Sequence, residues 1–500
     1  MGRRTMNRIQ KTMTWMGAIL IIVLHSPQIQ AQTLLSLDSA IHLAQTHSIA
    51  AQQAQHNYWD ACYQYRLYRK SLLPQLSLSG SLPAFNRTIS KITMPDGSEA
   101  FVSQSTGNYA ATLNLRQPIP FTGGSFYAST GLQRLDIYMD NTTTSYLANI
   151  VNFGISQPII TYNTYKWQKK MEPLALQKAQ RQYAEVLENI AFQTVVYFFE
   201  LLETQETLAL KVENKQNSDT LLATAREKFA IGKFTEAQVL EVEVDNLNLS
   251  LEIEQLKQEL SNRMRILCDY IGMEEDVSLR LQIPETITIV AIDYSKALSE
   301  YRENSQAETD HKHRLLQAQS EVARAKADNG FSFNLNASFG LSKNDELFRN
   351  IYRNPLDQEQ VTLSFEIPIL DWGVARCKRR KAENLLANEE LAIRQETMDL
   401  ERKLSDLVGQ FNIQNHRLQL AVRTAELSQK RYEITAESYA LGKIGFLDFS
   451  TAQYEKDNAR ITYIQALSTS WQSYYEIRRM TLFDFENGVK VTTELPDAPK

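Results

Sequence analysis

The stretch "FAIGKFTEAQVLEVEVDNLN", residues 229–248, has a near copy in "YALGKIGFLDFSTAQYEKDN", residues 439–458, which lies 210 positions further along the chain. The segment "SQPII" around Pro158 matches "EIPIL" around Pro368 at the same spacing. Because separate segments recur at one spacing, we interpret the chain as two copies of a single unit.

The first parts of the two copies lie further apart than their last parts. "AIHLAQTHS" from Ala40 resembles "ALSEYRENS" from Ala297, at a spacing of 257 positions. The difference between 257 and 210 places 47 extra residues in the first copy, between about Pro74 and Pro158.

Long helices follow the strands in each copy. No proline occurs between Pro173 and Pro284 or between Pro368 and Pro496, and glycine is sparse in both intervals. In the first interval, apolar residues recur mostly at three- and four-residue steps, as in an amphipathic helix that packs against its neighbours. We expect helical rods over residues 174–229 and 375–440, each on the order of 80 to 100 Å long at about 1.5 Å per residue.

The start of each copy is predicted to be a helix that gives way to strands. The helices cover about residues 38–72 and 293–328, and the apolar period then changes from 3.6 to 2 in "PQLSLSGSL" and "FSFNLNASFGLS". "YAATLNLRQPI" and "VTLSFEIPIL" supply the returning strands, and "ANIVNFGISQPII" supplies a further one. The polar stretches 86–108 and 342–360 are predicted to be surface loops.

Alternating strands of about ten residues have the length that crosses a membrane in a tilted barrel. A small soluble sheet that caps a helical bundle is the alternative. Two strands per copy give four per chain, whereas a membrane barrel needs at least about eight, so several chains would have to pool their strands. Three chains of four would give twelve, and "GGSFYASTGLQRLD" from Gly123 is a candidate for an additional hairpin.

The N-terminus has the pattern of an export signal. Four basic residues precede the apolar run "TWMGAILIIVL", and Ala31 supplies a small residue at a plausible cleavage point. About 11 apolar residues are fewer than the roughly 20 of a membrane-spanning helix, which disfavours the alternative of a retained anchor. Removal of residues 1–31 would change the formal charge from −5 to −9, which disfavours nucleic acid as a partner.

The duplicated order of helix, strands, long helix, glycine turn and helix resembles the TolC-type outer-membrane efflux proteins, over nearly the whole mature chain. The proline at each strand-to-helix passage and the "F/Y-A-x-G-K" turns add to the resemblance. It implies a mainly α fold with membrane β structure: a homotrimeric β-barrel in the outer-membrane lipid, continuing into a long periplasmic α-helical barrel. Such a protein is the exit channel of a tripartite efflux or secretion system, and an inner-membrane transporter and a periplasmic adaptor deliver its substrates.

The corresponding domain division has four parts. Residues 1–31 are the signal peptide and 32–290 the first repeat, with strands at about 74–160. Residues 291–485 are the second repeat, with strands at about 331–371, and 486–500 are a C-terminal tail.

The resemblance also implies roles for the glycine turns. Gly232–Lys233 and Gly442–Lys443 would form the periplasmic tips where the adaptor docks, although a Gly-Lys pair is equally the ordinary end of a helix. Family members often carry acids six and nine positions after the second glycine, and these close the tunnel entrance. The matching positions here hold Asp448 and Thr451, so one of the two is acidic.

The same offsets in the first copy give Gln238 and Glu241. These two residues, with Asp448 and Thr451, are the predicted pore constriction. For both acidic residues the alternative is a solvated helix face. Carboxylates gathered around a threefold axis repel one another and attract cations.

Other chemistry is weakly indicated. The cysteines, Cys62, Cys268 and Cys377, show no metal or disulfide spacing. The "HKH" at residues 311–313 places its histidines on different helix faces, and neither glycine turn has the P-loop pattern. We therefore expect no enzyme activity, metal or cofactor. An exported coiled-coil scaffold without a pore and a small-solute porin remain alternative functions.

Overall fold

The computed structural model describes residues 33–138, 142–273, 279–287, 291–441, 443–491 and 494–499. The predicted signal peptide, residues 1–31, lies outside these ranges. In the described part of the chain, no helix combines the length and hydropathy that crossing a membrane requires.

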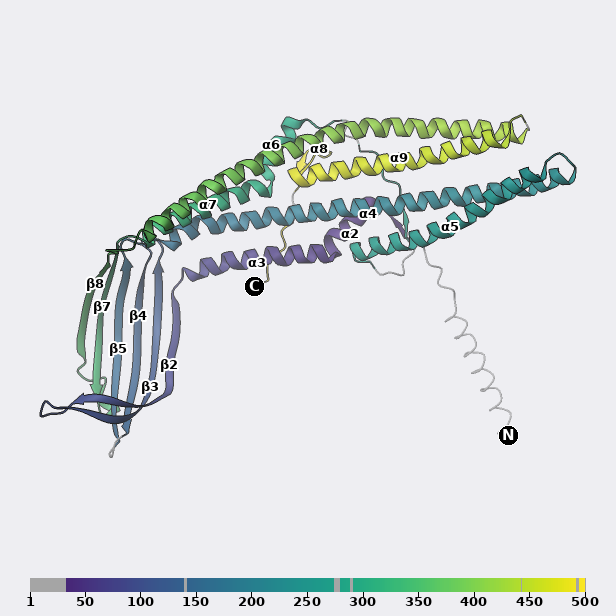
Figure 1. The fold of residues 1–500 in the computed structure, drawn as a ribbon. Helices are drawn as coiled ribbons and strands as arrows, with labels where there is room; N and C mark the ends of the chain where they lie inside the picture. Colours follow the sequence, from purple (N-terminus) through teal and green to yellow (C-terminus); the bar gives the residue numbers. More distant parts are fainter. Residues whose placement is uncertain are drawn as a thin grey trace, which may run out of the picture. The chain divides into compact units, whose positions relative to one another are not determined.

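The helices recur at the two spacings found in the sequence (Figure 1). α2 (Leu37–His47) and α3 (Ile49–Ser71) have the same lengths as α6 (Tyr294–Asn304) and α7 (Gln306–Asp328), 257 positions later. α4 (Thr164–Ala230) and α5 (Glu236–Ile271) have the same lengths as α8 (Val374–Ala440) and α9 (Phe446–Thr481), 210 positions later. The duplicated unit is confirmed.

Each predicted first helix is divided in two by a serine. Ser48 and Ser305 have extended backbone, with ψ of 149° and 148°, and both residues are buried. The Ser48 hydroxyl accepts a hydrogen bond from the Ala51 N–H at 3.1 Å and so caps the second segment. The carbonyl of Ser305 accepts a hydrogen bond from Arg181. Apolar periodicity continues across such a short break, so it did not reveal the break.

The chain contains two compact units, and each takes residues from both repeats. The first comprises residues up to 52, 187–292 and 409–476. It contains α2, α5, most of α9 and the later parts of α4 and α8, together with a short parallel pair between β1 (Thr33–Leu35) and β6 (Leu279–Leu281). Its core holds large, fully buried side chains from all four long helices: Phe198, Phe199, Leu267, Ile271, Phe411, Ile464 and Tyr474.

The second unit comprises residues 53–186, 293–408 and 477–500 and contains the main sheet. The strands are β2 (Gln75–Thr93), β3 (Glu99–Ile119), β4 (Gly124–Tyr138), β5 (Thr143–Pro158), β7 (Ser332–Asp345) and β8 (Leu356–Glu366). Their order is β2-β3-β4-β5-β7-β8, and every pairing is antiparallel (Figure 1). A small hairpin of β9 (Phe483–Asp484) and β10 (Val489–Lys490) follows α9.

The described sheet therefore has six strands per chain rather than the expected four. The start of β2 lies 257 positions before the start of β7, and Pro158 at the end of β5 lies 210 positions before Pro368, which follows β8. The first repeat thus contains β3 and β4 in addition to the pair that both repeats share. Gly123–Asp136, the candidate extra hairpin, lies in β4 and the turn before it.

The predicted loop at residues 86–108 is also strand. β2 and β3 stay paired from Asn86↔Thr106 to Thr93↔Glu99, and residues 94–98 turn the chain. Asp96 accepts hydrogen bonds from the Ser98 N–H and hydroxyl, and Gly97 has φ of 84°. Likewise β7 and β8 extend into the predicted loop at 342–360. Polar composition does not prevent strand pairing where side chains alternate and a tight turn closes the hairpin.

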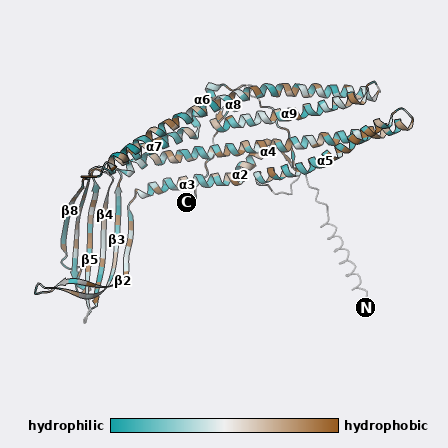
Figure 2. Cartoon of the chain, in the orientation of Figure 1, coloured by the Kyte–Doolittle hydropathy of each residue, from teal (hydrophilic) through white to brown (hydrophobic). Residues whose placement is uncertain are grey.

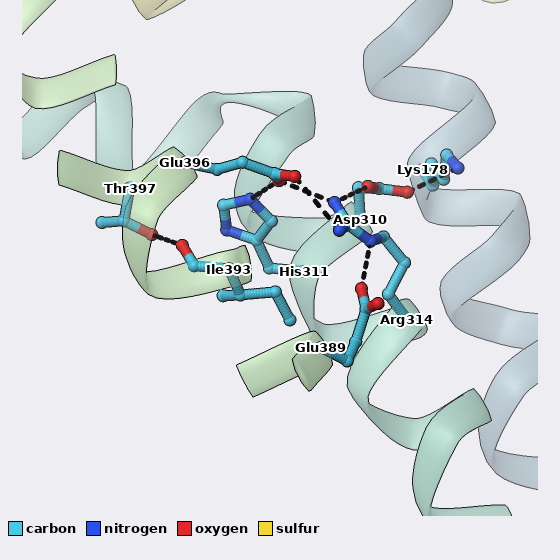
Figure 3. A network of polar contacts seen from close by, with 8 residues as sticks. All are labelled: Lys178, Asp310, His311, Arg314, Glu389, Ile393, Glu396 and Thr397. Carbon is cyan, nitrogen blue, oxygen red and sulfur yellow. Dashed lines mark hydrogen bonds and ion pairs between the residues drawn. The ribbon is translucent and has the colours of Figure 1, made fainter. Parts of the chain in front are cut away.

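A polar network ties three helices of the second unit together (Figure 3). Arg314 of α7 donates to Glu389 and Glu396 of α8, at 2.5 Å to Glu389 and 2.6 and 3.1 Å to Glu396. Asp310 of α7 lies 2.6 Å from Lys178 of α4. The Arg314 guanidinium lowers the pKa of the Glu396 carboxyl. Burial by itself would raise the pKa of Asp310, but Lys178 and Arg314 outweigh it and lower that pKa.

We expect this network to make the second unit acid-sensitive. Carboxyl groups with lowered pKa stabilise the fold at neutral pH, and that contribution is lost as pH falls below about 4.5 through their folded values. Arg314→Met should lower the melting temperature at pH 7 and flatten its decline between about pH 5 and pH 3. Arg423→Met, which removes an exposed pair with Glu426, is the matched control. Parallel melting curves for wild type and Arg314→Met across this range would contradict the assignment.

Candidate functional site

The six-stranded sheet has one apolar face. Directly paired residues share a face, so each row across the sheet is fixed by its register. One such row crosses all six strands at Leu76, Leu115, Ala128, Phe153, Phe339 and Glu359. Large side chains on this face are solvent-exposed in the single chain, among them Leu76 at 65%, Val361 at 75% and Phe365 at 66%. An exposed apolar face of this extent requires an apolar environment.

The opposite face is polar. The neighbouring row crosses the same strands at Ser77, Asn114, Ser129, Asn152, Gly340 and Gln358. Figure 2 shows the corresponding mixture of hydrophobic and hydrophilic segments along the strands. The alternation of apolar and polar side chains at period 2 is that of a strand with lipid on one side and water on the other.

The apolar face becomes polar at the end of the strands away from the helices. Arg134 of β4 donates to Asp136 at 2.9 Å, and Thr144 of β5 donates to the same carboxylate oxygen at 2.8 Å. The Arg134 guanidinium also lies over the rings of Tyr109 and Tyr146. Aromatic and charged side chains together are typical of the border between hydrocarbon and water.

The first glycine turn joins α4 to α5. Gly232 has φ of 72°, and the Lys233 N–H bonds to the Lys228 carbonyl at 2.8 Å, which closes the end of α4. α5 then begins with a capping box in which Thr235 and Gln238 bond each other's backbone N–H groups. Gln238, one of the predicted constriction residues, is thus engaged in starting its own helix.

The second glycine turn, between α8 and α9, has the equivalent closing bond, from the Lys443 N–H to the Ser438 carbonyl at 3.0 Å. Gly442 lies outside the described residues. The Phe449 ring stacks on Tyr439 with centroids 5.0 Å apart, and it contacts Tyr432 as well. Lys233 and Lys443 are both exposed at the ends of long helices, where a positive charge is favourable.

The remaining predicted constriction residues are exposed in the single chain. Asp448 lies in the first turn of α9, and Thr451 lies one turn later with its hydroxyl bonded to the Leu447 carbonyl at 2.7 Å. Glu241 is exposed on α5. Asp448 and Glu241 are therefore free to face other chains or water, whereas the Thr451 hydroxyl is bonded within its helix.

A buried lysine nearby was missed by the sequence analysis. Lys456 of α9 is 6% exposed, and its Nζ lies 3.4 Å from Asp457, 3.7 Å from Glu213 and 4.4 Å from the centre of the Tyr432 ring. It borders a groove of about 540 Å³ between α4, α8 and α9. The sequence does indicate that Lys456 is buried, because it lies on the apolar stripe of its helix between Ala452 and Ala459, which are both buried.

The comparisons with known proteins agree with this geometry. Residues 297–481 match the family model "Outer membrane efflux protein". No curated protein sequence gave a significant match. Three solved structures of similar fold are outer membrane channels or proteins: CmeC of Campylobacter jejuni, VceC of Vibrio cholerae and MtrE of Neisseria gonorrhoeae in its open state.

Their sequence identities are 14%, 13% and 14%, and their TM-scores 0.64, 0.63 and 0.57. The alignments cover 92%, 91% and 92% of this chain and 87%, 97% and 90% of those chains.

A sheet that is apolar on one face and polar on the other, joined to long duplicated helices, defines an outer-membrane transport protein with a periplasmic extension. Its second repeat carries the match to the outer membrane efflux protein family, and the fold of the whole chain is similar to that of outer membrane channels.

The turn at Gly232 gives a local prediction. A Cβ at Gly232 would meet no atom within 4 Å, so the cost of Gly232→Val comes from the left-handed backbone alone, about 1–2 kcal/mol. We expect faster tryptic cleavage at Lys228 and Lys233, with assembly retained. Gly445→Val is the control, because Gly445 has equally open surroundings without a positive φ. Equal rates of cleavage in the two variants would show that the positive φ of Gly232 does not stabilise this turn.

Proposed function

We propose that three copies of this chain form an outer-membrane channel, the exit duct of a tripartite efflux system. The observation that carries the proposal is the sheet: it has an apolar and a polar face, and both β2 and β8 are paired on one side only. A strand edge in hydrocarbon leaves N–H and C=O groups unpaired at several kcal/mol each. Pairing of β8 with β2 of the next copy satisfies both edges and closes a barrel.

The same geometry disfavours the two alternatives. A coiled-coil scaffold has no use for a sheet with an exposed apolar face that spans six strands. A small-solute porin needs little mass outside the membrane, whereas α4 and α8 are each 67 residues long, about 100 Å of helix at about 1.5 Å per residue. Channel and helical extension together support an exit duct that receives its cargo from a partner.

The partners are a periplasmic adaptor and an inner-membrane transporter. The adaptor docks at the two helical turns that contain Gly232, Lys233, Gly442 and Lys443. Each turn is closed by an equivalent backbone hydrogen bond, so the two turns offer the adaptor two similar surfaces per chain. The division into a signal peptide at 1–31, repeats at 32–290 and 291–485 and a tail at 486–500 belongs to the same proposal.

The pore entrance is closed by Asp448, which three copies bring together at the axis. Glu241 of α5 adds to the negative charge. Thr451 and Gln238 occupy the other two positions, but their side chains hydrogen-bond to the backbone of their own helices. The entrance thus carries one ring of Asp448 carboxylates and attracts cations.

The oligomeric state is directly testable. We expect the detergent-solubilised protein to be a trimer, since one chain leaves two sheet edges open. Light scattering with the detergent mass subtracted measures this. A monodisperse monomer would be incompatible with the proposed channel.

The charge of the entrance is tested by Asp448→Asn, which removes the carboxylate with little change in volume. In planar bilayers the variant trimer should be less cation-selective and less sensitive to block by divalent or trivalent cations. Asp448→Glu should retain both properties, and Glu241→Gln should have a smaller effect than Asp448→Asn. If Asp448→Asn behaves as wild type in both assays, Asp448 lies on the outer helical face and the entrance is closed elsewhere.

A further inference from the structure

The residues that the first repeat has in excess form a hairpin in the middle of the sheet. β3 pairs with β2 on one side and β4 on the other, and β4 pairs with β5. β2 and β5, the strands that correspond to β7 and β8 of the second repeat, do not pair with each other. The hairpin therefore cannot leave the sheet unless β2 loses its described partner.

Both added strands carry the same two faces as their neighbours. In β3, Leu113 and Leu115 belong to the apolar face, and Asn114 to the polar one. In β4, Phe126 and Ala128 pair into the apolar face beside Ile155 and Phe153, while Ser129 lies on the polar face opposite Asn152. Phe126, which is 40% exposed, and Leu113, which is 38% exposed, continue the exposed apolar patch of the neighbouring strands, and a hairpin in water would leave this part of the patch uncovered.

The apolar face has the height of a membrane. From Phe333 to Leu341, β7 keeps apolar side chains on this face over about 26 Å of strand at about 3.3 Å per residue. Tilted by about 40°, this gives about 20 Å, close to the roughly 25 Å apolar band of outer-membrane barrels. Ala128 of β4 lies in the same row as Phe339 of β7, so the added hairpin continues the apolar face of β7.

Closure is possible with six strands per chain. β2 leaves the helical end of the unit and β8 returns to it, so β8 of one copy meets β2 of the next in antiparallel orientation. Six strands per chain is an even number, as four would be. The first and last strands of a chain therefore run in opposite directions in both cases, and closure of the barrel requires no strand to change direction.

We propose that all six strands of each chain cross the membrane, so that the trimer forms a barrel of eighteen strands. This inference rests on the proposed trimeric channel. Barrel diameter grows roughly linearly with strand number, so the pore is about 1.5 times as wide as a twelve-stranded one. Its polar face is lined mainly by Ser, Thr, Asn and Gln side chains, so the barrel admits bulky solutes with little discrimination by charge.

The test compares adjacent residues on opposite faces. Ala128→Cys and Ser129→Cys in β4 are matched to Ala337→Cys and Ser338→Cys in β7. All four replace small side chains, and the background carries serine at Cys62 and Cys377 while the buried Cys268 is kept. Intact cells are treated with a membrane-impermeant maleimide. We expect labelling at Ser129→Cys and Ser338→Cys, and loss of labelling to background at Ala128→Cys and Ala337→Cys.

The outcomes separate this inference from the proposed function. A contrast in β7 together with labelling at both β4 positions would place the hairpin outside the membrane and overturn the eighteen-stranded barrel alone. The absence of a contrast in β7 would overturn the membrane channel itself. Cryo-electron microscopy of the unmodified trimer is independent of the variants: eighteen strands in cross-section support the inference, and twelve refute it.

Discussion

The hydrogen-bonding capacity of the peptide backbone is the constraint on which the structure depends. Hydrocarbon offers no partner to an N–H or C=O group, so each strand in it must be paired on both sides. In the single chain this condition holds for β3, β4, β5 and β7, and it fails at the outer edges of β2 and β8. The chain is therefore incomplete by itself in a membrane. The need for copies of the chain follows from these two edges and not from any specific contact.

Water imposes a weaker condition on the helices, because a helix satisfies its own backbone and needs partners only for its apolar stripe. The long helices can therefore pair across the two repeats. This explains why each compact unit draws on both copies, while the sequence division falls between them. Where charged groups lie between the helices, as do the partly exposed Arg314 and the buried Lys456, they are paired with carboxylates from a neighbouring helix.

The sequence was most informative where one periodicity persisted over a long distance. Helices α4 and α8 were predicted from their proline-free intervals, although α4 begins ten residues before the predicted start and contains Pro173 in an early turn. Pro173 is the tenth residue of α4, so it removes one backbone hydrogen bond inside the helix, and α4 nevertheless continues through it. The breaks at Ser48 and Ser305 were not predicted, because a single extended residue hardly changes the spacing of apolar residues. The hairpin at 86–108 was not predicted, because its alternating side chains are mostly polar and the prediction relied on apolar ones.

The candidate site was predicted less completely than the fold. The positive φ at Gly232 was predictable, because glycine is the residue type that adopts it most readily. The roles of Gln238 and Thr451 depend on hydrogen bonds within their own helices, and the position of Lys456 depends on which helices pack around it. Residue spacing within one segment contains no information on such packing. For Asp448 the spacing gives the helix position, whereas the direction of its side chain in an assembly depends on the neighbouring copies.

The extra hairpin also bears on how the size of such a pore can change. A hairpin is the shortest insertion that returns the chain to the side of the membrane from which it departed, so α4 starts where it would start without it. Adding one strand would instead leave every later helix on the wrong side. In this architecture pore width can therefore change only in fixed steps. Each inserted hairpin adds two strands per chain, and the helical part keeps its length and its turns.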